Sequence, residues 1–258
     1  MLIIRIPVKP NMNVVATVEA RMSSTRLPAK TMMQVAGKPI LELVIERLQS
    51  ATLVNHVVVA TTTNPRDDLI VSFCEENSID VHRGSESDVL RRVFETAQKF
   101  SADIIVQAGA DCPFYDPGLV DELIRIFKGG TYDYVANDML LTYPEGVDAH
   151  VMSMKVLSEI QELATKPRDR DDVPRYIWNH PERYRIFNLE APPDLRRPEI
   201  RLTLDYPEDL ILTQKIYDVL YTKNPHFTTR DVIMFLDKNP ELLTINANCK
   251  QLSAAYLP

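Results

Sequence analysis

Glycine is scarce in this sequence, with seven residues in a chain of 258. Neither of the two common glycine-rich nucleotide motifs, G-x-x-x-x-G-K-[ST] and G-x-G-x-x-G, occurs in it. Both motifs bind phosphate through backbone N–H groups at a tight turn that opens a helix. The absence of the second argues against a dinucleotide-dependent dehydrogenase. Any polyphosphate site in this chain must therefore depend mainly on side chains.

A basic excess, paired cysteines and a long apolar run are also missing. The net charge of −7 argues against a general nucleic-acid or membrane-surface binder. Cys74, Cys112 and Cys249 are widely spaced without metal-like pairing, which fits a reducing compartment. The opening MLIIRIP is too short for a signal sequence or a membrane-spanning helix. We therefore expect a soluble cytoplasmic protein with no nucleic-acid or membrane partner.

Short apolar runs alternate with longer amphipathic ones along the chain. The apolar runs predict strands at 13–18, 56–62, 80–84, 103–109, 132–137, 148–153 and 201–205. The amphipathic runs predict helices at 39–51, 67–78, 85–100, 117–129 and 206–221. Because strands that alternate with helices are usually parallel and joined by crossovers, the sequence predicts a doubly wound, mostly parallel α/β sheet.

The length suits one domain that covers residues 1–258. We place its core at 13–221 and a C-terminal helical extension at 222–258. Residues 154–200 break the alternation, because they are dense in charge, aromatic residues and proline. We interpret that segment as an inserted, projecting element.

A basic, hydroxyl-rich cluster follows the first predicted strand. Within EARMSSTRLPAKT lie Arg21, Arg26 and Lys30, together with Ser23, Ser24 and Thr25 and without any glycine. In doubly wound sheets, ligands bind at the carboxyl ends of the strands. Guanidinium and ammonium groups at such an end suit a triphosphate. By composition alone, a solvated surface loop explains the cluster equally well.

The pattern of this cluster resembles the A-R-x-x-S-x-R-L-P-x-K signature of cytidylyltransferases that activate sugar acids. That family includes CMP-sialic acid and CMP-Kdo synthetases and the spore-coat polysaccharide protein branch. The matching residues are Ala20, Arg21, Ser24, Arg26, Leu27, Pro28 and Lys30. Further stretches match the last branch in order, among them RGSESDVLRR, ADCPFYDPGLVDELI, YPEGVDAHV and RLTLDYPEDL. The resemblance spans about residues 13–220.

The resemblance implies a fold of the nucleotide-diphospho-sugar transferase type and a Mg²⁺-dependent nucleotidyltransferase. CTP and a hydroxyl of a sugar acid would give a CMP-sugar, a surface polysaccharide precursor, and pyrophosphate. Arg21, Arg26 and Lys30 would hold the triphosphate, with Ala20 and Ser24 beside them. Arg21 and Lys30 are also candidate catalytic residues.

Two aspartates follow predicted strands directly, Asp111 in VQAGADCP and Asp205 in RLTLDYPED. Carboxylates at strand carboxyl ends can converge across a cleft and suit Mg²⁺. Taken singly, each is more simply a turn or helix cap. The resemblance implies that both are metal ligands, Asp111 also acting in catalysis. It places Asp148 near the acceptor, where it would bind hydroxyls or assist deprotonation, although a plain strand-start residue fits the sequence equally well.

Recognition of the base is expected from two loops. Arg83, Ser85 and Asp88 in RGSESD and Gln107 in VQAGAD can donate to and accept from a pyrimidine edge. The simpler alternative is a surface ion pair of Arg83 and Asp88, with Ser85 as a helix cap.

The sequence departs from the family pattern at several positions. Glu19 stands where glutamine or proline is usual, and its charge should weaken triphosphate binding unless it is offset. Asp172 replaces a histidine within 169–176. These departures support the alternative of a catalytically silent nucleotide-binding scaffold. The enzymatic alternative is a nucleotidyltransferase that uses a sugar or polyol phosphate as acceptor, or UTP as donor. By the resemblance, the projecting element makes a two-fold contact, so we expect a homodimer.

Overall fold

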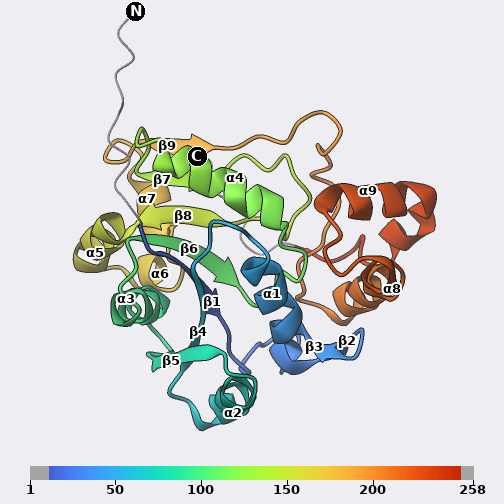
Figure 1. Cartoon of the computed structure of the whole chain (residues 1–258), viewed down its shortest axis with the longest axis horizontal. Helices are drawn as coiled ribbons and strands as arrows, with labels where there is room; N and C mark the ends of the chain where they lie inside the picture. Colours follow the sequence, from blue (N-terminus) through green and yellow to red (C-terminus); the bar gives the residue numbers. More distant parts are fainter. Residues whose placement is uncertain (1–11, 251–258) are drawn as a thin grey trace, which may run out of the picture.

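A computed structural model describes residues 12–250, so the opening apolar run lies outside the described residues. Seven strands form one sheet in the order β5-β4-β1-β6-β8-β7-β9 (Figure 1). Their bounds are β1 Val14–Glu19, β4 His56–Thr62, β5 Asp80–Gly84, β6 Ile104–Gly109, β7 Tyr134–Ala136, β8 His150–Ser153 and β9 Ile186–Asn188. Only β8 runs antiparallel to its neighbours, so the mostly parallel sheet that the sequence predicts is confirmed.

Helices cover both faces of the sheet (Figure 1). One face carries α1 Ile40–Gln49, α2 Asp68–Glu76 and α4 Pro117–Lys128, with α8 Pro207–Lys223 and α9 Thr229–Lys238 beside them. The other carries α3 Val89–Lys99, α5 Met154–Leu163, α6 Pro167–Arg170 and α7 Arg175–Asn179. A short hairpin, β2 Gln34–Val35 and β3 Lys38–Pro39, and the 3-10 segments η1 Lys30–Met32, η2 Pro65–Asp67 and η3 Pro240–Thr244 complete the described elements.

Two hydrophobic cores follow from the alternation of the central strand β1. Val14, Ala16 and Val18 pack in the core with α1 and α4, whereas Val15 packs in the core with α3 and α5. Glu19 has the same parity as Val15. It therefore lies on the α3 side, at the carboxyl end of the strand.

The helix starts show why the chain turns where it does. Asp116 caps α4 by accepting hydrogen bonds from Gly118 N and Leu119 N, and Pro117 occupies the first turn. Asp88 caps α3 by accepting a hydrogen bond from Arg91 N at 2.9 Å.

The strand expected at 201–205 does not form. Its backbone makes one isolated bridge, between Glu145 and Arg201, and then continues as a buried loop. The alternating polar side chains Arg201, Thr203 and Asp205 are buried in a polar network rather than facing solvent across a sheet.

Part of the segment expected to project is packed into the domain. Helix α5 lies against α3, and Val173 and Ile177 are completely buried in the second core. Within residues 12–250, none of the helices combines the length and the apolar character needed to cross a bilayer.

Candidate active site

Two adjoining cavities open at the carboxyl ends of β1 and β6. One, of about 250 Å³, is also lined by Arg21, Lys30 and Arg92, and we call it the basic cavity. The other, of about 350 Å³, is also lined by Asp138, Asp148, His150, Asp172 and Trp178, and we call it the acidic cavity. The shared wall consists of Glu19, Arg26, Gly109, Asp111 and Asp205.

Lys30 lies at the junction of the two cavities. Its ammonium donates to Asp111 Oδ2 at 2.8 Å, to Asp205 Oδ1 at 2.9 Å and to the carbonyl of Leu204 at 2.8 Å. Burial lowers the pKa of Lys30, but the two carboxylates outweigh it and raise the pKa above its usual value. Residues that are far apart in the sequence therefore meet around one positive charge.

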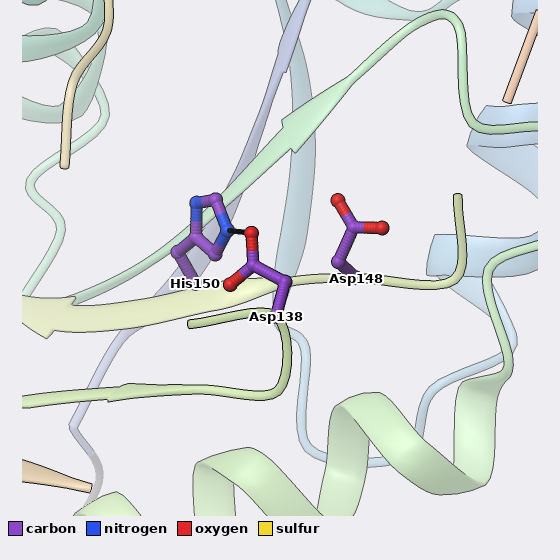
Figure 2. Close-up of side chains that lie close together, drawn as sticks. All are labelled: Asp138, Asp148 and His150. Carbon is purple, nitrogen blue, oxygen red and sulfur yellow. Dashed lines mark hydrogen bonds and ion pairs between the residues drawn. The ribbon is translucent and has the colours of Figure 1, made fainter. Parts of the chain in front are cut away.

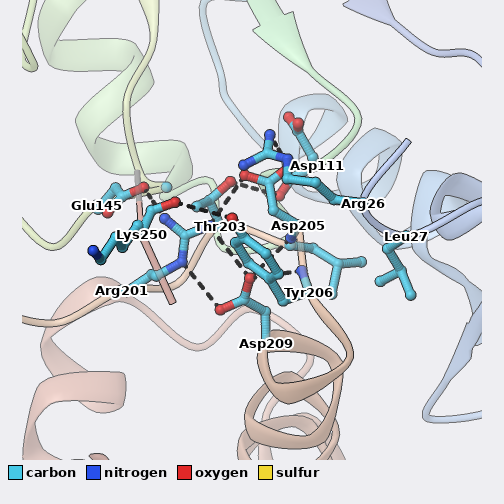
Figure 3. Close-up of polar contacts among 12 residues, drawn as sticks. Arg26, Leu27, Asp111, Glu145, Arg201, Thr203, Asp205, Tyr206, Asp209 and Lys250 are labelled. Atoms are coloured by element: carbon cyan, nitrogen blue, oxygen red, sulfur yellow. Dashed lines mark hydrogen bonds and ion pairs between the residues drawn. The ribbon is translucent and has the colours of Figure 1, made fainter. Parts of the chain in front are cut away.

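Asp205 is held by cations on both sides (Figure 3). Arg26 contacts Oδ1 at 2.7 Å and Arg201 donates to Oδ2 at 3.0 Å. Arg201 also pairs with Asp209 and Glu145, which fixes its guanidinium behind Asp205. The sequence alone did not single out Arg201. The available signal was its spacing of two from Thr203 and of four from Asp205, which places all three side chains on one face of the predicted strand.

Asp111 is more open than Asp205, with about a third of its side chain exposed. Burial raises the pKa of Asp111, but Lys30 outweighs this and keeps it below the usual value, so the group is ionised. Asp111 and Asp205 thus offer hard carboxylate oxygens that both contact the ammonium of Lys30. This donor set fits a divalent ion such as Mg²⁺.

Ala20, Arg21 and Ser24 of the first loop also line the basic cavity. Arg21 is exposed, and Ala20 is buried with its N–H donating to Ala60 O at 3.3 Å. Ser24 Oγ accepts a hydrogen bond from Leu27 N at 3.3 Å, which tightens the loop. Ala29 adopts a left-handed backbone conformation, φ 60°, that leads into η1 and Lys30.

Arg92 is a cation that sequence analysis did not single out. It lines the basic cavity from α3 although only 2% of its surface is exposed. Its Nη1 donates to Ser85 O at 2.5 Å, while its buried Nε has no hydrogen-bond partner within the described chain. Gly84 makes room for it, because a Cβ there would lie 2.9 Å from Arg92 Cγ. The sequence signal for Arg92 was its place among the residues 89–97 that form the buried side of the predicted helix, where a charged residue is unusual.

Three of the four residues expected to read the base lie outside both cavity linings. Arg83 donates to Thr62 O and Asn64 O and pairs with Asp68, so it ties β5 to the loop after β4. Ser85 Oγ accepts from Asp88 N at 3.1 Å. Asp88 caps α3 and pairs with Arg170 at 2.7 Å. The remaining one, Gln107, lines the acidic cavity.

A hydrogen-bonded chain runs across three strands from Glu19 to Asp138. Gln107 Nε2 donates to Glu19 at 2.9 Å, and His150 Nδ1 contacts Gln107 Oε1 at 2.5 Å. His150 Nε2 contacts Asp138 Oδ2 at 3.0 Å (Figure 2). The strand register places Gln107 opposite His150, which accounts for the alignment.

Two members of this chain, Glu19 and His150, have unusual pKa values. Burial raises the pKa of Glu19 to about 7, against the weaker effect of its hydrogen bond from Gln107. Burial lowers the pKa of His150, but Asp138 outweighs it and raises the pKa to about 9. His150 is therefore an imidazolium near neutral pH, and both ring N–H groups are engaged. The sequence signal was the spacing of two between Asp148 and His150 in the strand expected at 148–153, which predicts a shared face.

Asp148 and Asp172 complete the acidic cavity. Asp148 Oδ1 accepts a hydrogen bond from Gly146 N at 2.8 Å, and burial raises the pKa of Asp148 to about 6, with Asp138 adding to the effect. Asp172 pairs with Arg175 at 2.9 Å. Figure 2 shows the side chains of Asp138, Asp148 and His150 directed to the same side of β8.

Comparison with known proteins assigns the family. A cytidylyltransferase family model matches residues 15–239. An uncharacterized protein of Methanocaldococcus jannaschii is 32% identical over 94% of this chain and 98% of its own length. The spore coat polysaccharide biosynthesis protein SpsF of Bacillus subtilis is 30% identical, over 88% of this chain and 95% of its own.

The fold agrees with that assignment. The solved structure of a cytidylyltransferase from Leptospira borgpetersenii matches with a TM-score of 0.85 at 27% identity, over 90% of this chain and 97% of its own. The resemblance that the sequence motifs indicate is thus confirmed over most of the chain. The chain belongs to the cytidylyltransferase family and is a nucleotidyltransferase.

Proposed function

We propose that this enzyme transfers CMP from CTP, with Mg²⁺, to a hydroxyl of a sugar-type precursor of a surface polysaccharide and releases pyrophosphate. The sequence resemblance favours a sugar acid as the acceptor. One observation carries the proposal. Lys30 bridges Asp111 and Asp205 at the junction of a basic and an acidic cavity, so phosphate-binding cations and carboxylates share one wall.

The basic cavity is suited to the triphosphate. Arg21 and Arg92 line it, and Arg26 and Lys30 stand at its edge in contact with carboxylates. When the triphosphate enters, its oxygens compete for Arg26 and Lys30, since phosphate accepts charge-assisted hydrogen bonds as well as carboxylate does. Asp111 and Asp205 then face the cleft with less cationic compensation.

Asp111 and Asp205 are the residues that would hold Mg²⁺. The ion supplies charge neutralisation at the transferring phosphate. It also explains why two carboxylates lie beside a triphosphate site that would otherwise repel them.

The transfer step needs a hydroxyl in line with the α-phosphate. A bond forms between the acceptor oxygen and the α-phosphorus, the bond from that phosphorus to the bridging oxygen breaks, and pyrophosphate leaves. The hydroxyl proton passes to a carboxylate or to solvent. Asp148 lines the acidic cavity and has a pKa of about 6, so it is suited to accept that proton near neutral pH.

Pyrophosphate release tests the proposal. The purified chain is mixed with each of the four ribonucleoside triphosphates, Mg²⁺ and a panel of sugar acids, neutral sugars and sugar phosphates. We expect release with CTP, abolition by EDTA, and a loss of at least about 100-fold in Asp111→Asn. Asp218→Asn, on the exposed face of α8, is the matched control. Release that needs UTP, or that survives EDTA and Asp111→Asn, contradicts the proposal.

Calorimetry separates an enzyme from a silent nucleotide-binding scaffold. CTP binding that strengthens with Mg²⁺ in the wild type and not in Asp111→Asn supports the metal assignment.

A homodimer in the cytoplasm remains part of the proposal, and sedimentation of the purified chain tests the dimer.

A further inference from the structure

The C-terminal segment of the described chain returns to the candidate active site. After α9 it forms η3 Pro240–Thr244 and continues to Lys250, whose carbonyl accepts a hydrogen bond from the hydroxyl of Tyr206 at 3.4 Å. The cytidylyltransferase family model ends at residue 239. The contacts of residues 240–250 with the site therefore belong to a part of the chain that the family match does not cover.

Asn246 connects this segment to the site through a buried side chain. Only 5% of the residue is exposed, and its Nδ2 donates to Arg201 O at 3.1 Å and to Asp209 Oδ1 at 2.8 Å. Both hydrogens of the amide group are thus directed at acceptors, one on the backbone and one on a carboxylate. Removal of the amide would leave these two buried oxygens with fewer donors.

Asp209 passes this contact on to the loop that carries Asp205. Its Oδ2 accepts hydrogen bonds from the backbone N–H groups of Asp205 at 2.9 Å and Tyr206 at 3.0 Å, and its Oδ1 accepts from Arg201 Nε at 3.1 Å. Asp209 is the third residue of α8, where a carboxylate commonly binds the N–H groups that precede a helix. Asp209 therefore fixes the backbone of Asp205 relative to α8.

Arg201 fixes the side chain of Asp205 as well. Its Nη2 donates to Asp205 Oδ2 at 3.0 Å, and its Nη1 donates to Glu145 at 2.5 Å (Figure 3). The other oxygen of Asp205, Oδ1, contacts Lys30 at 2.9 Å and Arg26 at 2.7 Å. The two oxygens thus have different roles, because Oδ2 is held by the protein interior and Oδ1 lies on the side of the residues that line the basic cavity.

We propose that Asn246 is a positioning residue for the metal ligand Asp205. By holding Asp209 and the backbone of Arg201, it keeps Asp205 in the conformation that offers Oδ1 to a divalent ion. The role rests on the proposed function, which assigns Mg²⁺ to Asp111 and Asp205, and it makes the C-terminal segment part of the metal site. Asn246 acts only through Asp209 and Arg201.

The Mg²⁺ dependence of CTP affinity separates this role from simple anchoring of the C-terminal segment. Calorimetry gives the Kd of CTP in Mg²⁺ and in EDTA, and the ratio of the two values measures what the ion contributes. Loss of a residue that orients a metal ligand typically costs about 10- to 100-fold in metal affinity. Because Asn246 acts through a further residue, we expect Asn246→Ala to reduce the ratio about five- to tenfold and to change the value in EDTA less than about twofold.

Three further variants calibrate this result. Asn246→Ser keeps a single donor, so it should reduce the ratio less, and it takes the place of Asn246→Ala if that variant does not fold. Arg201→Met removes the direct contact with Asp205 and should reduce the ratio most. Asn239→Ala is the matched control, since its Nδ2 donates to Phe235 O at 2.8 Å at the end of α9. It should lower the unfolding temperature and leave the ratio unchanged.

The outcomes distinguish this role from the proposed function. A ratio in folded Asn246→Ala equal to that of the wild type, or an equal reduction in Asn239→Ala, overturns the positioning role and leaves the proposed function intact. A reduction confined to the Asn246 and Arg201 variants supports the role, even if no acceptor in the panel yields pyrophosphate. A wild type whose CTP affinity does not respond to Mg²⁺ overturns the metal assignment of the proposed function and the positioning role together.

Discussion

The basic and acidic cavities share a wall and use their charges differently. In the basic cavity, Arg92 keeps a buried Nε without a partner, and Arg21 is exposed. In the acidic cavity, both cations are paired with carboxylates of the protein. The basic cavity thus retains positive charge for an incoming anion, whereas the cations of the acidic cavity are already neutralised by protein carboxylates. The difference shows that local pairing, and not the net charge of −7, decides what each cavity attracts.

The largest effect is expected at Lys30, which contacts Asp111 and Asp205 of the shared wall. Replacing Lys30 by methionine should lower CTP-dependent pyrophosphate release about 100- to 1000-fold, because Asp111 and Asp205 lose their common cation and the triphosphate loses a ligand. A steady-state pyrophosphate assay measures the effect. Lys38→Met is the control, since Lys38 pairs with Glu42 and Glu46 on α1. Retention of more than about a tenth of the rate would refute the role.

Arg92 tests the positive charge of the basic cavity. Arg92→Met should weaken CTP binding about 10- to 100-fold, measured by calorimetry, because the proposed function has this buried guanidinium bind phosphate. The unfolding temperature should not fall, since burial without a full set of partners lowers the pKa of Arg92 and costs stability. Arg91→Met is a matched control on the exposed side of α3. Equal losses in both variants would disprove the assignment.

Glu19 sharpens the comparison through pH. Its folded pKa of about 7 is raised from 4.5, so its ionisation in the folded protein is disfavoured and stability falls as pH rises from about 4.5 to 7. Near the triphosphate, the same ionisation should weaken CTP binding as pH rises through about 7. Glu19→Gln should bind CTP about as well as wild type at pH 6 and several-fold more tightly at pH 8.5. Parallel pH profiles for the two proteins would exclude this effect.

Arg83 lies outside the linings of both cavities. Because its guanidinium is engaged with Asp68 and two carbonyls outside the cavity linings, Arg83→Met should change CTP affinity less than about threefold. Calorimetry at constant Mg²⁺ gives the value, and thermal unfolding reports any loss of the tie to the loop after β4. A loss of more than about tenfold in CTP affinity would support the base-reading role that the sequence suggests.

The first loop was predictable because its members are neighbours in the sequence. Arg21, Ser24, Arg26 and Lys30 follow one apolar strand within ten residues, so they must gather at its carboxyl end. The order of strands and helices follows equally from periodicity, and the prediction of a mostly parallel sheet is confirmed.

The spatial order of the strands in the sheet does not follow from the sequence pattern, although it decides which loops lie next to each other. Arg83 is the last residue but one of β5, at the edge of the sheet, and β4 separates β5 from β1. Gln107 lies within β6, next to β1, and lines the acidic cavity. The sequence presents both as polar residues near strand ends, so it does not distinguish them.

The sequence by itself determined the fold class, the family and the basic loop, because these depend on periodicity and on residues close together along the chain. The tertiary structure decided which charges are paired and which are free. Glu19, Gln107, His150 and Asp138 come from separate elements, and only their packing joins them into one chain. Electrostatic energies depend on distance and on burial, and both are set when the strands come together.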